Sequence, residues 1–180
     1  MINLVLRRLA LSLLLCIAAS ANNHTFAAPL KPWKQGATPS LALMDLQGQP
    51  RSLDEFRGEV VIINFWATWC EPCIEEMPSL QKFKDRFAGE KVAVIGVNLG
   101  EGEARIKSFT DKTGIAFPIL LDRDGIAKKD WKVNGVPATF ILDSAGRIQY
   151  THIGVLDFSD EAFTRQILRL LPPKTARKKA

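Results

Sequence analysis

Apolar residues occur along the chain in two patterns, as short continuous runs and at a helical spacing of three or four residues. Continuous runs typical of strands buried on both faces cover residues 60–66, 92–97 and 138–143. Shorter extended segments are expected at 118–121 and, after the turn "SAGR", at 148–153. The pattern therefore predicts a sheet whose central strands are covered by helices.

The helices are predicted from the helical spacing. The segment after Trp66 carries apolar residues at Ile74, Met77, Leu80, Phe83 and Phe87. Pro78 lies inside this segment and is expected to kink the helix or to mark a short first turn. Further helices are expected near 103–112, near 126–131 and after Ser159, which would cap the last one. The apolar face of that last helix comprises Phe163, Ile167, Leu168, Leu170 and Leu171.

Strands that alternate with helices, closed by a hairpin and a helix, indicate one α/β domain with a central mixed sheet flanked by helices. An N-terminal β-hairpin is expected from "LALMDL" and "GQPRSL", with its turn at Gly48. The three prolines in residues 28–39 indicate an extended lead-in. The predicted domain spans residues 40–172, and a basic, disordered tail is expected at 173–180.

Residues 1–27 have the order of a secretory signal peptide. Arg7 and Arg8 precede 13 apolar or small residues, and the polar stretch that follows ends in "TFAAP", with cleavage expected after Ala27. Thirteen helical residues span about 20 Å, less than the ~30 Å hydrocarbon core of a bilayer. We therefore expect an exported protein that is soluble after cleavage rather than anchored by this segment.

The excess of basic residues lies outside the predicted domain. The whole chain has 24 Lys and Arg against 19 Asp and Glu, and removal of residues 1–27 leaves 22 against 19. Four of those 22 bases lie after Leu171, so residues 28–172 have 18 bases, 19 acids and a net charge of −1. This balance does not support a nucleic-acid-binding surface, and no nucleic acid is expected as a partner.

Cys70 and Cys73 are the only cysteines that remain once the predicted signal peptide is removed. They lie where a buried strand meets an amphipathic helix. Three residues along a helix place two Cα atoms about 5 Å apart on one face, which is within the range of a disulfide. As a structural staple, a ring of four residues would contribute only about 2 kcal/mol. A redox-active disulfide is therefore favoured.

The position of the two cysteines at the strand-to-helix junction indicates a different chemical role for each sulfur. At this position the sulfur of Cys70 faces unpaired N–H groups and the positive end of the helix dipole, which favour a thiolate. We expect Cys70 to be the attacking nucleophile and Cys73, deeper in the helix, to resolve the mixed disulfide. A zinc site is not expected, because two thiolates make half a site and His152 is alone on a predicted strand. No metal or cofactor is expected.

The motif "WCEPC", preceded by "VVIINFWAT" and followed by "EEMP", resembles the TlpA/ResA/CcmG (DsbE) group of exported thioredoxin-like proteins. "GVPATFILD" resembles the second thioredoxin signature, in which the proline is cis and lies opposite the cysteines. The likeness implies a cis Pro137 across from Cys70, with Val136 offering backbone groups to a substrate. "GVNLGE…FPILLD" resembles the strand-and-helix insertion of this group, so the implied fold is thioredoxin-like with a central insertion.

The resemblance also implies a function, that of a periplasmic thiol–disulfide oxidoreductase that reduces its substrates. These substrates would be the CxxC of apocytochrome c or thiols of copper-site assembly proteins. A membrane thiol reductant of the DsbD/CcdA type would return the protein to its reduced state. Glu76 matches an acidic position near the active site of the group, with the role of proton shuttle or tuner of the cysteine pKa values. The alternative for Glu76 is an ordinary solvated charge. Trp69 is expected to contact substrate, whereas Trp66 is expected in the core.

Two other functions stay open. A peroxiredoxin-like peroxidase shares the fold, but it would have a proline and then a threonine three residues before its cysteine, whereas Thr68 stands two residues before Cys70. A copper-binding assembly chaperone would hold the metal through Cys70, Cys73 and His152.

The segment "NLGEGEAR" after a predicted strand is similar to a dinucleotide-binding loop. However, Arg105 stands where the third glycine belongs. Glu101 and Glu103 would also repel a pyrophosphate, so nucleotide binding is not expected.

Overall fold

The structure is a computed structural model that describes residues 30–172; the predicted signal peptide and the predicted basic tail lie outside these residues. Six strands form one mixed sheet in the order β1-β8-β7-β4-β5-β6. Strands β4, β5 and β6 are parallel to one another. Strand β7 pairs antiparallel with β4, β8 with β7, and β1 with β8. The strands are β1 (Lys31–Pro32), β4 (Val60–Trp66), β5 (Val92–Leu99), β6 (Ile119–Asp122), β7 (Ala138–Leu142) and β8 (Ile148–Ile153). The predicted mixed sheet is confirmed.

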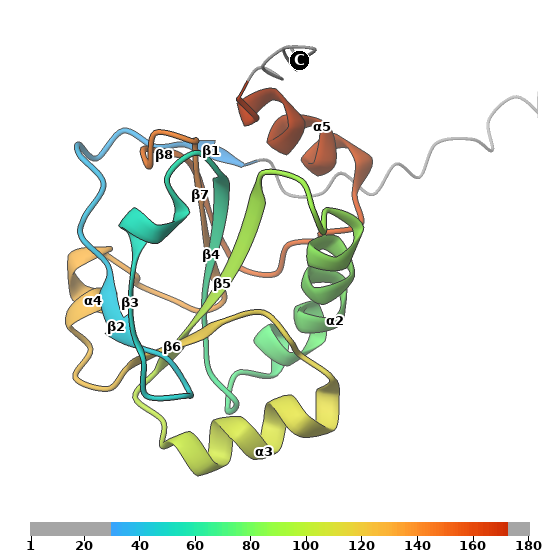
Figure 1. Cartoon of the computed structure of the whole chain (residues 1–180). Coiled ribbons are helices and arrows are strands. Elements are labelled where there is room, and N and C mark those ends of the chain that lie inside the picture. The colour runs from blue at the N-terminus through green and yellow to red at the C-terminus, as the bar shows by residue number, and fades with distance from the viewer. Residues whose placement is uncertain (1–29, 173–180) are drawn as a thin grey trace, which may run out of the picture.

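Helices cover both faces of this sheet (Figure 1). One face packs against α2 (Glu71–Arg86), α3 (Glu103–Thr113) and α5 (Glu161–Leu170). The other face packs against α4 (Ile126–Asp130) and the N-terminal hairpin of β2 (Ala42–Met44) and β3 (Pro50–Ser52), which continues into a short 3-10 helix, η1 (Leu53–Phe56). Among the helices of residues 30–172, none has the length and apolar character needed to cross a membrane.

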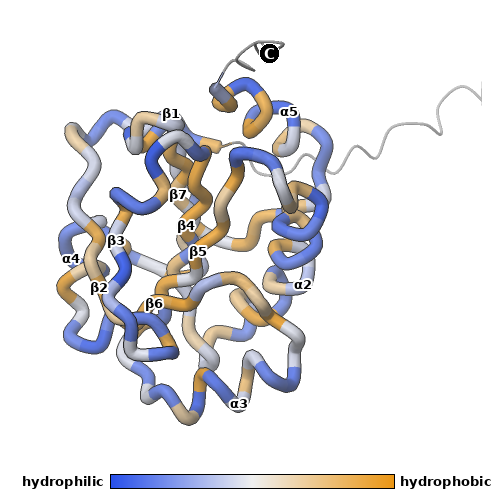
Figure 2. The backbone as a smooth tube through the Cα atoms, viewed as in Figure 1, coloured by the Kyte–Doolittle hydropathy of each residue, from blue (hydrophilic) through white to orange (hydrophobic). Residues whose placement is uncertain are grey.

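Strand β4 lies at the centre of the fold, and all seven of its residues are buried. Its alternate side chains enter two different cores, because successive residues of a strand point to opposite faces. Ile62 and Trp66 join the core under α2 and α5, while Ile63 and Phe65 join the core under α4. Figure 2 shows the hydrophobic colouring concentrated in the central strands and mixed with hydrophilic residues along the helices. The burial of β4 on both faces explains the continuous apolar run at residues 60–66 of the sequence.

Four local features refine the elements predicted from the sequence. Helix α2 continues through Pro78, whose ring is on the exposed side. Asp160, not Ser159, caps α5: its carboxylate accepts hydrogen bonds from two backbone N–H groups of the first turn. Leu168 is exposed rather than part of the apolar face. The extended lead-in contributes β1, which pairs with β8 at the sheet edge.

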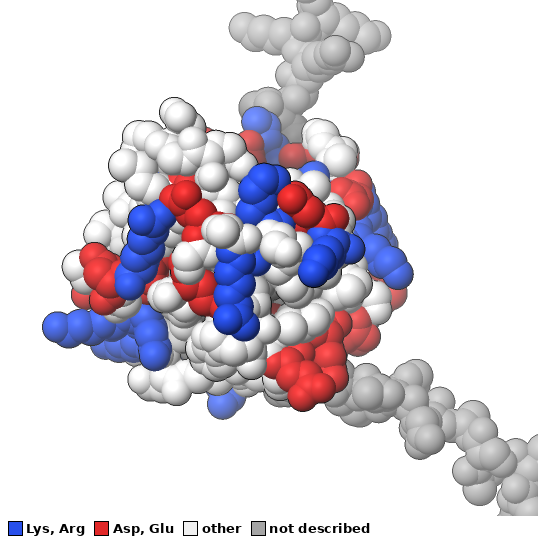
Figure 3. All heavy atoms as spheres, turned by 90° about the horizontal axis from the view of Figure 1, so that it is seen from below, with Lys and Arg blue, Asp and Glu red and all other residues white. Residues whose placement is uncertain are grey.

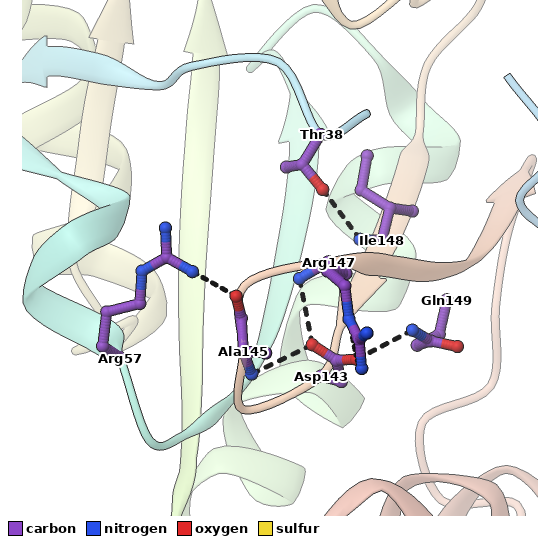
Figure 4. Close-up of polar contacts among 7 residues, drawn as sticks. All are labelled: Thr38, Arg57, Asp143, Ala145, Arg147, Ile148 and Gln149. Atoms are coloured by element: carbon purple, nitrogen blue, oxygen red, sulfur yellow. Dashed lines mark hydrogen bonds and ion pairs between the residues drawn. The ribbon is translucent and has the colours of Figure 1, made fainter. Parts of the chain in front are cut away.

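The turn between β7 and β8 is held by Asp143 (Figure 4). Its carboxylate accepts hydrogen bonds from the backbone N–H of Ala145 and from the backbone and side chain of Arg147. The Arg57 guanidinium donates to the carbonyl of Ala145 from the segment before β4. Since β7 runs antiparallel to β4, this turn lies at the end of the sheet opposite Cys70.

Candidate active site

The turn that follows β4 presents Cys70 at the N-cap of α2. The Cys70 N–H donates to the carbonyl of Ala67 (3.2 Å), which closes the turn. The Cys70 sulfur accepts a hydrogen bond from the backbone N–H of Cys73 (3.3 Å). The two sulfurs form a disulfide, and their Cα atoms are 5.2 Å apart, in agreement with the helical spacing. Cys73 thus supplies both the sulfur that forms the disulfide with Cys70 and an N–H group that can stabilise a thiolate on Cys70.

The two cysteines differ in exposure. Cys70 is 5% exposed and Cys73 is fully buried, so Cys70 is the more accessible of the two. The side chain next to Cys70, Trp69, is 63% exposed and projects into solvent, whereas Trp66 is buried in the core as expected. Figure 3 views the end of the molecule with α3 and the start of α2, where acidic and basic side chains are mixed on the visible surface.

Residues Val136 and Pro137 lie at the same end of the sheet as the cysteines. The peptide bond between them is cis. Phe65 pairs with Ala138, so Pro137 is opposite the end of β4 where the active-site turn begins. Pro137 is buried and Val136 half-buried, and the carbonyl of Pro137 accepts a hydrogen bond from the Gly154 N–H (2.8 Å). The structure therefore brings these two residues and Cys70 to one site.

Glu76 is a buried carboxyl group in the second turn of α2, with only 2% of its surface exposed. One oxygen accepts from the side-chain amide of Asn64 (2.7 Å) and the other from the backbone N–H of Leu156 (3.0 Å). Burial raises the pKa of Glu76 from 4.5 to about 7, although both hydrogen bonds act to lower it. The alternative of a solvated charge is wrong, because the β8–α5 loop covers this side chain.

Asn64 and Thr139 belong to the site but were missed in the sequence. They are directly paired across β4 and β7, and the Asn64 amide donates to the Thr139 hydroxyl (3.2 Å) as well as to Glu76. Both residues are fully buried. A single polar residue in the apolar run "VVIINFW" was the signal that could have identified Asn64.

His152 is buried on β8, directly opposite Thr139. Burial lowers the pKa of His152 and nearby Lys31 adds to this effect, while the contact of its ring nitrogen with the carbonyl of Val155 (3.2 Å) opposes it. Within residues 30–172 no group of three or more His, Cys, Asp or Glu is arranged to hold a metal ion.

Similarity to known proteins agrees with the class that the fold and the cysteine pair define, the thioredoxin-like thiol–disulfide oxidoreductases. The chain belongs to the AhpC/TSA family, whose model matches residues 35–151, and within it to the ResA-like thiol–disulfide oxidoreductases. The thioredoxin-like fold class, the family resemblance and the type of enzyme predicted from the sequence are therefore confirmed.

Three relatives illustrate the similarity. Thiol-disulfide oxidoreductase ResA of Geobacillus thermodenitrificans is 32% identical over 158 residues, which cover 87% of this chain and 91% of that protein. A Chlorobium tepidum protein assigned as thiol:disulfide interchange protein DsbE has a TM-score of 0.71 at 27% identity, covering 79% of this chain and 100% of the other. A secreted disulfide oxidoreductase of Mycobacterium tuberculosis, homologous to E. coli DsbE, shares the fold with a TM-score of 0.63 at 22% identity, covering 72% and 96%.

Proposed function

We propose that this oxidoreductase is an exported reductant of disulfides in other proteins, in which Cys70 attacks and Cys73 resolves. The observation that carries this assignment is the hydrogen bond from the Cys73 N–H to the Cys70 sulfur at the start of α2. A negative charge on Cys70 is stabilised there by the helix N-terminus. The greater exposure of Cys70 supports the same order of attack.

The reaction transfers two electrons to the substrate. In the reduced protein, the Cys70 thiolate attacks one sulfur of a substrate disulfide, which forms a mixed disulfide and releases the other substrate sulfur as a thiolate. The Cys73 thiol then loses its proton and attacks the Cys70 sulfur. This step forms the Cys70–Cys73 disulfide and releases the second substrate thiolate. The substrate leaves with two thiols after it takes up two protons.

Glu76 is the proposed acceptor of the proton from Cys73. The two residues are three positions apart on α2, so they lie on neighbouring positions of one helix face. A carboxyl with a pKa of about 7 can accept and return a proton near neutral pH. Its hydrogen bonds to Asn64 and Leu156 keep the carboxylate in place while the charge changes.

Substrate binding is assigned to Trp69, Val136 and Pro137. The exposed Trp69 offers an apolar surface beside the reactive sulfur, and aromatic side chains are effective anchors in interfaces. The half-buried Val136 lies next to the cis proline, where its backbone can hydrogen-bond to an extended substrate segment.

The proposed substrates are the CxxC of apocytochrome c and the thiols of copper-site assembly proteins, with a membrane reductant of the DsbD/CcdA type as electron donor. The proposed location is the periplasm, with residues 1–27 removed as a signal peptide. This proposal rests on the basic and apolar order of those residues, and the similarity to a secreted disulfide oxidoreductase supports it.

A trapping experiment tests the order of attack and identifies the substrate. The C73A variant is expected to accumulate a mixed disulfide through Cys70, because the resolving thiol is gone, and mass spectrometry of the adduct names the substrate. The C70A variant is the matched control and should trap nothing. An adduct on C70A but not on C73A would reverse the assigned roles.

Two further measurements distinguish the alternative functions. Copper titration of the reduced protein should show no tight site, whereas an assembly chaperone would bind copper and lose it in the C70S variant. Peroxide consumption in the absence of an added thiol would instead support a peroxidase.

A further inference from the structure

The loop after β5 carries a carboxylate that the mechanism above does not use. Glu101 is on the segment "NLGEGEAR", and its side chain is only 7% exposed. One of its oxygens accepts hydrogen bonds from the backbone N–H of Thr68 (2.7 Å) and from the side-chain amide of Asn98 (2.8 Å). The other accepts from the Thr68 hydroxyl (2.5 Å) and pairs with the Arg105 guanidinium (3.2 Å). All the contacts of this carboxylate are thus made with the active-site turn, β5 and α3.

Sheet topology explains why Glu101, which is 33 positions after Thr68 in the sequence, reaches the active-site turn. Strands β4 and β5 are parallel neighbours, so their carboxyl ends meet at one edge of the sheet. The turn Ala67–Trp69 leaves the end of β4, and Glu101 follows the end of β5. The two segments therefore lie side by side, and α3 starts from the same place with Gly102 as its N-cap.

We propose that Glu101 is a positioning residue for thiol–disulfide exchange, which fixes the Thr68–Trp69 turn and through it the placement of Cys70. Thr68 donates two hydrogen bonds to this carboxylate, one from its backbone N–H and one from its hydroxyl. The next residue is the exposed Trp69, and the one after it is Cys70. This inference rests on the proposed role of Cys70 as the nucleophile.

Arg105 completes the arrangement. Its Nε group contacts both the Thr68 hydroxyl (2.7 Å) and the Glu101 carboxylate, so α3 is tied to the same turn. Burial alone would raise the pKa of Glu101, but the hydrogen bonds from Thr68 and Asn98 and the charge of Arg105 hold that pKa below its ordinary value. Glu101 therefore stays ionised, and its four acceptor positions stay available, throughout the pH range in which thiols exchange.

The E101A variant tests the inference. Loss of the carboxylate is expected to slow the reaction of reduced Cys70 with iodoacetamide and with a disulfide-bonded insulin substrate by about tenfold or more, because a misplaced nucleophile loses orientation. The Thr68 amide, which is bonded to Glu101 in the wild type, should lose its protection from hydrogen exchange in NMR spectra. In E101Q the amide oxygen can still accept from Thr68 and Asn98, so both protection and most of the rate should return.

The matched control is E103Q. Glu103 is two residues further on and pairs with Arg123 at the surface, so its replacement should change neither the rate nor the exchange of Thr68. If E101A fails to fold, T68A, which removes only the hydroxyl contacts to Glu101 and Arg105, should show partial slowing instead.

Three results would overturn the inference. The first is an E101A variant that is folded, has lost the protection of Thr68 and still reacts at the wild-type rate. The second is a T68A variant that reacts at the wild-type rate when E101A does not fold. The third is equal slowing in E101A and E103Q. The trapping experiment separates these outcomes from failure of the proposed function: an adduct on C73A upholds Cys70 as the nucleophile whatever the Glu101 variants do.

Discussion

The burial of Glu76 leads to a quantitative prediction for the stability of the oxidised protein. Below pH 4.5 this carboxyl is protonated in both the folded and the unfolded chain, so its contribution to stability is fully present. As pH rises above 4.5, Glu76 ionises in the unfolded chain but not in the folded one, so its contribution to stability decreases. The decrease ends once pH exceeds the folded pKa of about 7. With these two pKa values, the titration of Glu76 lowers the free energy of unfolding by about 2–3 kcal/mol between pH 5 and pH 8.

The E76Q variant lacks this titration. Its unfolding free energy, measured by urea denaturation at several pH values, should rise relative to the wild type by about 2–3 kcal/mol on going from pH 5 to pH 8. The lost hydrogen bond to Asn64 or Leu156 adds an offset that does not depend on pH, and other titrating groups are common to both proteins. The exposed neighbour Glu75 provides the control, since E75Q should show no such trend. A constant difference between wild type and E76Q over this pH range would refute the reasoning.

Two further predictions concern the scaffold, and urea denaturation measures both. D160A should lower the free energy of unfolding by about 1 kcal/mol because α5 loses its N-cap, whereas S159A should change it by less than about 0.5 kcal/mol; equal losses would contradict the assignment of the cap. G96A should cost about 1–3 kcal/mol, because a Cβ at Gly96 would lie 2.7 Å from the Ile119 side chain. G135A adds only a 3.6 Å contact, so a cost as large as that of G96A would contradict this steric explanation.

The strands and the redox pair could be predicted because their signals are local. The run Val60–Trp66 is apolar except for Asn64 because β4 is covered on both faces, and its β-branched residues favour a strand. The spacing of Cys70 and Cys73 on a helix likewise determines the distance between their Cα atoms without reference to the rest of the chain.

The polar environment of the site could not be predicted, because it depends on contacts between distant segments. Glu76 accepts a hydrogen bond from the backbone of Leu156, which is 80 positions away, and Glu101 reaches Thr68 only through the pairing of β4 with β5. The prediction of Ser159 as the helix cap was wrong for a different reason: Ser and Asp both cap helices well, and only the path of the backbone makes the neighbouring Asp160 the cap.

The unequal exposure of the two cysteines has a consequence for the catalytic cycle. Of the two cysteines, only Cys70 has exposed surface, and it is next to the exposed Trp69. Under the proposed function, the electron donor that reduces the disulfide and the substrate that consumes the thiols should therefore dock on the same face. The two partners therefore exclude each other, and one must dissociate before the other arrives. Steady-state kinetics should then follow a ping-pong pattern, and an excess of oxidised donor should inhibit the enzyme competitively against its substrate.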